Sequence, residues 1–525
     1  MRGPLPLAGG SPFVCHPPLA AWADAIEANR AQVPSWSFSI AGVPAAELRA
    51  RARRRVLEIA GMEDDGRPLV VTGHQPVFYH PGVWIKAFAV TGQARCRDWR
   101  AVNLTVDHDA AELAAEVPFR SGDELRYTKE FLVIPQSGRP LESLPPPAPE
   151  QVAQFVARVE ERLASLDWSD GAERFRRFAQ ALRDACRTAP HAAGVGVLSR
   201  RGYERSFGET LCPDVSVAET SAAPEFLLFF VHWAVHAREL QQAYNRALAL
   251  FRAEHRVRSA ANPFPDLRQL PDGSVELPFW GVTGAGIRRK LYARRKGGDI
   301  ELVNLEGVFA KMPAKGGGSA VEAIIASGAR VRPKAVPLTV FYRLFVADLF
   351  VHGTGGGRYD QVTDALISDY FGIRPPAFGV VSASLYLPLG VRPVPPTAIS
   401  AQRRKLRDLV FNPQRYAWEA GDVDEELARL LARKEELIQA INEPGAARRA
   451  LTREIEAVNR ALGKKLAPVA AKAQEELSRL KARARSAAVA WRRTYPFFLF
   501  APGSLWELLS VPAGGPRETL ETQGG

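Results

Sequence analysis

Two apolar segments in the first quarter of the chain end abruptly in side chains that can do chemistry. Residues 69–72 run into Gly73-His74-Gln75-Pro76, and residues 101–106 run into Asp107-His108-Asp109. Strands of a parallel sheet are buried, and ligands bind beyond their carboxyl ends. Two such ends, about thirty residues apart, therefore predict one shared site.

The turn after the first segment carries two histidines and a glutamine. Gly73 allows a sharp turn, so that His74 and Gln75 project beyond the strand, and His80 follows on the same loop. Either histidine can act as a general base, or as a cation that faces a carboxylate or phosphate. The alternative is a capped turn in which these polar groups only satisfy the backbone.

The triplet Asp107-His108-Asp109 offers a base with a carboxylate partner. Neighbouring side chains on an extended segment point in opposite directions, so the three cannot all reach one ligand atom. One carboxylate is free to orient His108 while the other faces the site, or the triplet caps a helix that begins near Ala110. No further matched ligand accompanies the triplet, so we expect no metal.

A third candidate is the glycine-rich loop Gly353–Gly357, which lies between His352 and Arg358. Free backbone N–H groups beside the start of a helix favour a phosphate. The loop matches neither GxGxxG nor the Walker A pattern, and a tight turn without a ligand is the alternative. His232 and His236 have the spacing of metal ligands, but the Glu of HExxH is missing, which favours core histidines.

Composition narrows the class of protein. The 525 residues carry a net charge of +12, and four widely spaced cysteines (Cys15, Cys96, Cys186 and Cys212) fit a reducing cytoplasm. Neither a secretory signal nor a membrane span is expected. The densest basic cluster, Arg49 to Arg55, is typical of the solvated face of an amphipathic helix, which favours a protein that does not bind nucleic acid.

Apolar periodicity predicts the elements that position these residues. Helices are expected at 20–62, 83–91, 150–187, 224–255, 338–347 and 359–371, and strands at 69–72, 101–106, 125–134, 349–351 and 378–381. Short antiparallel strands are expected within 274–310, with a hairpin turn at 297–299, and a flexible connection at 315–319. The simplest arrangement is one parallel sheet whose halves are separated by a long insertion.

Beyond residue 396 the pattern becomes that of long helices. Leucines and other apolar residues recur at helical spacing over 424–442, and again over 451–484 after the turn Glu443-Pro444-Gly445. This predicts an antiparallel hairpin with a coiled-coil seam of about 45 residues. Pro468 is expected to kink the second helix, because it has no backbone N–H. Oligomerisation or orientation is the expected role.

These residues together resemble the bacillithiol biosynthesis cysteine-adding enzymes (BshC family). Residues 70–86 are similar to that family's strand, turn and helix, residues 103–112 to its second strand and acidic motif, and Gly353–Gly357 to its glycine-rich turn. The segment His74-Gln75-Pro76, with the aromatics that follow and Lys86, also resembles WbqC-like proteins. Those are associated with the acylation of amino sugars for surface polysaccharides.

The resemblance implies an α/β fold: a discontinuous Rossmann-like parallel-sheet core with inserted connecting domains and a C-terminal α-helical coiled coil. The expected units are 1–120 and 331–396 for the core, 121–260 for a mostly helical insertion, 261–330 for a small β-rich insertion, and 397–525 for the coiled coil. The family's members are ligases, and a homodimer through the coiled coil is expected.

The implied function is the joining of an amino acid, cysteine in the family, to the amine of an amino sugar. His74 or His108 would deprotonate the amine, with Asp107 and Asp109 beside them. The expected binding residues are Gly73, Gln75, His80, Lys86, His352, Gly353, Gly355, Gly356 and Arg358. An ADP- or ATP-type nucleotide is implied as a cofactor.

Three alternatives remain open on the sequence. One is amino-sugar acylation of the WbqC type. Another is a non-catalytic protein in which a Rossmann-like scaffold and coiled coil assemble partners. The third is a nucleic-acid-binding protein driven by the positive charge, which a steep dependence of binding on salt would support.

Overall fold

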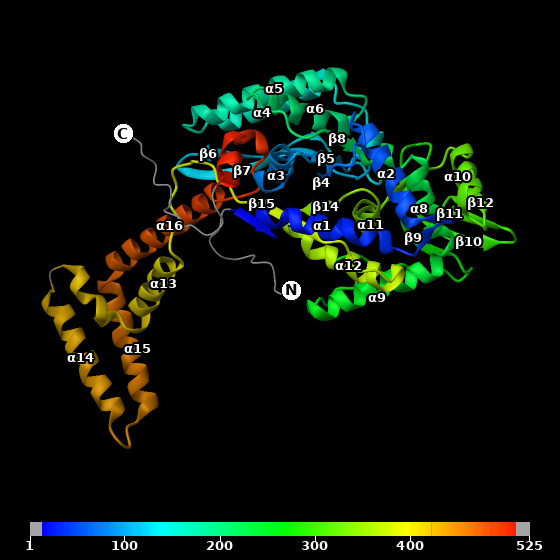
Figure 1. The fold of residues 1–525 in the computed structure, drawn as a ribbon. Helices are drawn as coiled ribbons and strands as arrows, with labels where there is room; N and C mark the ends of the chain where they lie inside the picture. The colour runs from blue at the N-terminus through cyan, green and yellow to red at the C-terminus, as the bar shows by residue number, and fades with distance from the viewer. Residues whose placement is uncertain (1–12, 422, 511–525) are drawn as a thin grey trace.

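A six-stranded sheet forms the centre of the computed structural model, which describes residues 13–421 and 423–510 (Figure 1). In spatial order its strands are β1 (Phe13–His16), β15 (Phe378–Ala383), β14 (Leu349–His352), β4 (Leu69–His74), β5 (Arg100–Thr105) and β8 (Asp214–Ser216). All neighbouring pairs are parallel except β1 and β15. The predicted α/β class is confirmed, and β4 and β14 join two distant parts of the chain in one sheet.

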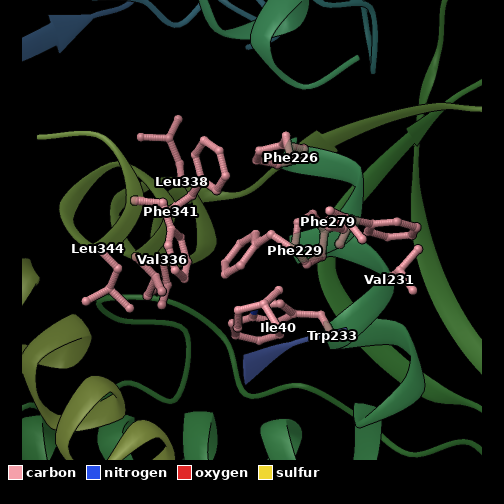
Figure 2. Close-up of a cluster of buried hydrophobic side chains, with 14 of the residues drawn as sticks. Ile40, Phe226, Phe229, Val231, Trp233, Phe279, Val336, Leu338, Phe341 and Leu344 are labelled. Atoms are coloured by element: carbon pink, nitrogen blue, oxygen red, sulfur yellow. The ribbon is translucent and has the colours of Figure 1, made fainter. Parts of the chain in front are cut away.

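Helices cover both faces of this sheet, and the alternation of side chains along the strands assigns each residue to a face. Val70 packs toward α1 (Trp22–Gln32) and α3 (Pro81–Arg97), whereas its neighbour Val71 packs on the opposite side. The second face is covered by α2 (Ala45–Ile59), α8 (Pro224–Val235), α11 (Ala335–Phe345) and α12 (Thr354–Phe371). Figure 2 shows part of this layer, where Phe226 and Phe229 of α8 meet Phe341 of α11.

The long insertion between β5 and α11 contains a hairpin, several helices and a second sheet. Its first part comprises β6 (Leu113–Ser121), β7 (Glu124–Val133), α4 (Pro149–Ala164), α5 (Ser169–Thr188), α6 (Ala192–Arg205), α7 (Val217–Thr220) and α9 (Ala237–Glu254). The second sheet has the order β12 (Gly307–Pro313), β11 (Asp299–Asn304), β10 (Arg288–Lys296), β9 (Val275–Val282) and β13 (Arg330–Pro333), and all its pairs are antiparallel. The predicted antiparallel strands and their hairpin turn are confirmed.

Four predicted boundaries are wrong. Residues 20–62 form α1, the short hairpin β2 (Ser39–Ile40) and β3 (Val43–Pro44), and α2 rather than one helix. The expected helix 150–187 divides into α4 and α5 at residues 165–168, a Ser- and Asp-containing segment that favours helix ends. The helix from Pro224 breaks at His236, and the connection at 315–319 runs directly into α10 (Gly317–Ala326).

A helical arm projects from the body of the molecule (Figure 1). It consists of α13 (Pro396–Phe411), α14 (Glu425–Asn442), α15 (Arg448–Lys465) and α16 (Ala467–Ala490). Helices α14 and α15 pack against each other, which confirms the predicted hairpin. The uninterrupted 45-residue seam is wrong, because the chain divides at Leu466, and Pro468 lies in the first turn of α16, where its missing N–H costs nothing.

The chain returns from the arm to the body through a cluster of buried aromatic side chains. Tyr495, Phe497 and Phe498 are fully buried, and Phe498 stacks on Phe178 of α5 at a ring-centroid distance of 4.0 Å. The short helix α17 (Gly503–Ser510) follows and packs on α3. The helical arm is therefore connected to the body both where the chain enters it and where the chain leaves it.

Two arginines of α2 are buried, so the prediction of a wholly solvated basic face is wrong. Arg49 and Arg53 each donate to a different carboxylate oxygen of Asp348, at 2.7 Å in both cases. The same carboxylate accepts the backbone N–H of Leu69 at 2.8 Å. Asp348 directly precedes β14 and Leu69 begins β4, so this buried group joins the two halves of the sheet.

We expect the substitution Asp348→Asn to lower the free energy of unfolding by about 3–5 kcal/mol, because it leaves two buried guanidinium groups without their counter-charge. Thermal and denaturant unfolding measure the effect. The matched control is Asp369→Asn, which removes the exposed pair with Arg246 and is expected to cost less than about 1 kcal/mol. Equal losses in the two variants would contradict the role given to Asp348.

Candidate functional site

The central sheet has a topological switch point between β4 and β14. Helix α3 connects β4 to β5 across one face, and α12 connects β14 to β15 across the other, so the two crossovers diverge from this pair of strands. In open α/β sheets ligands bind beyond the carboxyl ends of the strands at such a point. We define the switch-point site as residues 73–82, which follow β4, and residues 352–358, which follow β14.

The turn after β4 depends on a glycine and carries a neutral histidine. A Cβ at Gly73 would lie 2.7 Å from the Cβ of Leu104, so no other residue fits without a shift. His74 donates from Nδ1 to the carbonyl of Gln75 at 3.1 Å. Burial, with the nearby charge of Lys86, lowers the pKa of His74 to about 3. His74 is therefore uncharged at neutral pH, and it binds protons weakly.

Helix α3 places a histidine and a lysine beside this turn. His80 caps the helix by accepting the N–H of Gly82 at Nδ1 over 3.0 Å, and burial with the charge of Arg493 lowers its pKa to about 4. Lys86 donates to the carbonyl oxygen of Gly73 at 2.5 Å. Burial lowers the pKa of Lys86 to about 8, and no carboxylate among the described residues pairs with it.

Asp107 and His108 follow β5, but they are enclosed by the insertion. Asp107 accepts the hydroxyl of Ser216 at 2.5 Å and the N–H of Ala218 at 2.9 Å, and so caps α7. His108 is 2 % exposed and donates from Nε2 to the carbonyl of Pro333 in β13 at 2.9 Å. Burial raises the pKa of Asp107 and lowers that of His108. The side chains of Asp107 and His108 are thus bound to residues of the insertion.

Asp109 and Gln75 are brought together between the two strand ends. Asp109 accepts the amide of Gln75 at 2.8 Å and the guanidinium of Arg288 at 2.7 Å. Burial opposes ionisation of Asp109, yet His108, Gln75 and Arg288 hold its pKa below the ordinary value. Asp109 is therefore a fixed negative charge that orients Gln75.

An open pocket of about 470 Å³ adjoins Gln75 on the side of the β6–β7 hairpin. It is lined by Gln75, Val77, Phe78, Ala110, Ala111, Glu112, Ala114, Glu116, Lys129, Pro135 and Thr494. Arg492, at the root of the helical arm, holds the carboxylate of Glu116 at 2.6 Å and 2.7 Å. A second pocket, of about 380 Å³, lies beside Pro68 and Trp99 at the amino ends of the strands, away from these polar groups.

The glycines after β14 belong to a helix and not to a loop, so that prediction is wrong. Gly353 is the N-cap of α12, and the helix begins at Thr354. Gly357 is required by packing, because a Cβ there would lie 2.4 Å from Val380, whereas Gly353 and Gly355 have no atom within 4 Å of a built Cβ. Arg358 forms no ion pair with any described residue and is half-buried.

Beneath this turn lie three linked side chains. His352 Nε2 is 2.9 Å from the carboxylate of Asp360, and Arg343 of α11 donates to the same oxygen at 2.7 Å. Sequence reasoning missed Arg343, Arg288 and Arg493. A signal existed for Arg343, since it is the only charged residue of the otherwise apolar helix α11. The structure therefore adds a buried cation to the group of residues predicted around position 352.

No residues of the site form a metal cluster. Within residues 13–421 and 423–510, no group of three or more histidine, cysteine, aspartate or glutamate side chains is placed to hold a metal ion. His232 is a core histidine, as expected: it accepts the N–H of Ala41 at 3.3 Å, and Tyr370 lies 2.9 Å from its other nitrogen.

The lowered pKa of Lys86 makes the stability of the fold depend on pH. Between pH 8 and pH 10.5 the unfolded chain holds a proton on this lysine that the folded chain has released, so the stability of the wild type rises with pH in this window. We expect Lys86→Met to stabilise the fold by roughly 3 kcal/mol below pH 8, with the gain vanishing toward pH 10.5. Denaturant unfolding from pH 6 to 10.5 measures it, with Lys311→Met, at an exposed surface lysine, as control. A gain that does not change with pH would contradict the prediction.

Comparisons with known proteins give no family assignment. No protein-family model matches the chain, and no curated protein matches it either.

Proposed function

We propose that this protein is an enzyme with a Rossmann-like core that joins an amino acid to the amine of an amino sugar, as the resemblance to the cysteine-adding family implies. The observation that carries the proposal is the switch point itself. The first turns of α3 and α12 lie on opposite faces of the sheet, and each begins beside a strand that ends in a histidine. Both helix starts favour negative charge.

The two open glycines support an anionic ligand at α12. A glycine in a helix costs about 0.5–1 kcal/mol relative to alanine. Neither backbone conformation nor packing requires Gly355 in the first turn of the helix, and Gly353 at the N-cap is equally open. Glycine is expected where a ligand must approach the backbone closely, and here it would expose the free N–H groups of the first turn. Arg358, which has no ionic partner among the described residues, adds a positive charge.

We assign the remaining residues by the groups they leave free. Gln75, oriented by Asp109, would position the acceptor amine, and Lys86 would face the carboxylate or phosphate of the substrate. Asp107 and His108 would support the site by fixing α7 and β13. An ADP- or ATP-type nucleotide fits the same turn, with Gly353, Gly355 and Gly356 and Arg358 holding phosphate. When bound, ATP would supply the energy to activate a carboxylate.

We place the reaction in the cytoplasm. All four cysteines are free thiols, which fits a reducing compartment. None of the helices in the described ranges is long and apolar enough to cross a bilayer. The proposal does not depend on this location, but it determines which amino sugars are available.

The direct test is to incubate the purified protein with cysteine, a panel of amino sugars and ATP, and to detect an amide product by mass spectrometry. We expect Gly355→Asp to weaken substrate binding at least about tenfold, about 1.4 kcal/mol, because its carboxylate repels an anion at the first turn of α12. Gly298→Asp, at an equally open hairpin glycine, is the control. The absence of an amide with every amino sugar would refute the proposed reaction.

A role of the arm in assembly is favoured by its exposed apolar side chains. Val410, Phe411 and Trp418 are 60 %, 61 % and 74 % exposed, which is unusual for side chains so large. We propose that these residues contact a second copy of the chain, so that the protein is a homodimer through its helical arm. The arm would then connect two catalytic bodies.

Light scattering coupled to size-exclusion chromatography tests this assembly. We expect the wild type to have twice the mass of one chain and the double variant Phe411→Ser/Trp418→Ser to have the mass of a monomer at the same concentration. Leu305→Ser changes an exposed apolar residue on the β11–β12 turn of the body and should leave the dimer intact. A monomeric wild type would rule the dimer out.

A further inference from the structure

Three buried polar side chains form a line that ends at the switch-point site. Arg343 of α11 donates to Asp360 of α12 at 2.7 Å, and Asp360 lies 2.9 Å from His352 Nε2 at the end of β14. The side chains of Arg343 and Asp360 are 1 % and 2 % exposed, whereas that of His352 is 10 % exposed. Within the line His352 is the most exposed member, and Arg343 also pairs with Asp364 of α12 at 2.7 Å, a carboxylate that is 37 % exposed.

The charges of this line fix the proton position on His352. Burial would raise the pKa of Asp360, but Arg343 and His352 outweigh burial and bring it to about 2. Asp360 is thus a carboxylate and can only accept, so His352 must carry its proton on Nε2 and donate it. His352 Nδ1 makes no hydrogen bond with any described residue, so its lone pair is free in the tautomer that is protonated on Nε2.

The glycine at position 356 keeps that nitrogen open. A Cβ at Gly356 would lie 2.9 Å from His352 Nδ1, closer than real Cβ contacts allow. The backbone at Gly356 is not left-handed, so conformation does not demand glycine there. The residue gives up helix stability, and what it leaves uncovered is Nδ1 of His352.

The other histidines of the region lack this combination. His80 uses Nδ1 to accept the N–H of Gly82, and His108 is enclosed by β13. His74 has no carboxylate partner, and Lys86 disfavours its protonated form. A general base needs a free nitrogen and a neighbour that stabilises the charge it gains. Of these four residues, His352 alone has both.

We propose that His352 is the general base of the switch-point site, and that Asp360 and Arg343 are positioning residues that orient its ring. The proposal rests on the proposed amide-forming function and names the residue that moves the proton. As the amine nitrogen attacks an activated acyl donor, such as an acyl phosphate, the C–N bond forms. The C–O bond to the leaving group breaks with its electron pair, and the amine proton passes to His352 Nδ1. Asp360 stabilises the resulting imidazolium.

The first experiment probes the free nitrogen without any substrate. Diethyl pyrocarbonate acylates unprotonated imidazole, and peptide mass spectrometry of the full-length protein reads the rate at each histidine. We expect His352 to react and His108 to remain unmodified. A His352 that is as inert as His108 would overturn the proposal, because its Nδ1 would then not be accessible to a reacting group.

Variants distinguish a role of Asp360 and Gly356 in proton transfer at His352 from a merely structural contact. Gly356→Ala should slow the modification of His352 several-fold, since its Cβ covers Nδ1, whereas Gly355→Ala should not, because its Cβ meets no atom. In Asp360→Asn the pH at which modification is half-maximal should move downward, because an amide cannot stabilise the imidazolium. If Asp360→Asn does not fold, the glycine pair still decides the test. Equal rates in the two glycine variants, or an unmoved pH profile, would overturn the assignment.

Kinetics complete the test if the amide-forming reaction is found. We expect His352→Gln to lower kcat about 10²–10⁴-fold with KM little changed, as for loss of a general base. His255→Gln, at a half-buried histidine bound to Gln361, should keep the wild-type rate. If the wild type has no activity, the proposed reaction is refuted, and the modification experiments alone test whether His352 is the general base. If His352→Gln keeps the wild-type rate, the assignment of His352 as the base is refuted and the proposed reaction is not.

Discussion

The buried carboxylate of Asp348 is the contact on which the rest of the structure depends. It binds Leu69, 279 positions earlier in the chain, and is neutralised by Arg49 and Arg53 of α2. A carboxylate in such a place is stable only when it is fully paired. Because it fixes the start of β14 against the start of β4, it sets the register Leu349 to Val70, and with it the relative positions of the two carboxyl ends where we place the site.

The insertion determines which strand ends remain available for chemistry. Its second sheet closes over the end of β5, where His108 donates to Pro333 and Arg288 pairs with Asp109. Next to them Arg332 forms a buried bidentate pair with Glu142. The end of β5 is thus part of the contact surface between the core and the insertion. The ends of β4 and β14 keep partly exposed polar groups, and this is why we place the reaction there.

The sequence predicted the strands better than it predicted their surroundings. Buried parallel strands read as continuous apolar runs, so the segments at 69, 101, 349 and 378 were identified from the sequence alone. The burial of Arg49 and Arg53 was not, because an amphipathic pattern does not reveal that a carboxylate 295 or more positions away will meet one face. Likewise, the chemistry of Asp107 and His108 was evident, but their enclosure depends on Ser216 and Pro333, which reach them only through the folded insertion. The sequence predicts a loop over Gly353–Gly357, but α12 begins at Thr354, so the structure overrides the low helix propensity of glycine.

The two ends of β14 carry the same kind of group with opposite consequences. At its start, Asp348 accepts hydrogen bonds from two guanidinium groups and a backbone N–H, so protein groups fully pair its carboxylate. At its end, His352 is bound by Asp360 of α12, which also receives the guanidinium of Arg343, and the far nitrogen of the imidazole has no partner among the described residues. A buried carboxylate that is fully paired in this way stabilises the fold and has no group left to bind a ligand. A buried carboxylate that binds a ring with a free nitrogen leaves an unsatisfied acceptor at the edge of the sheet, and a donor brought to that nitrogen can form the hydrogen bond that it lacks. The asymmetry between these two ends is the physical reason to expect proton transfer at His352.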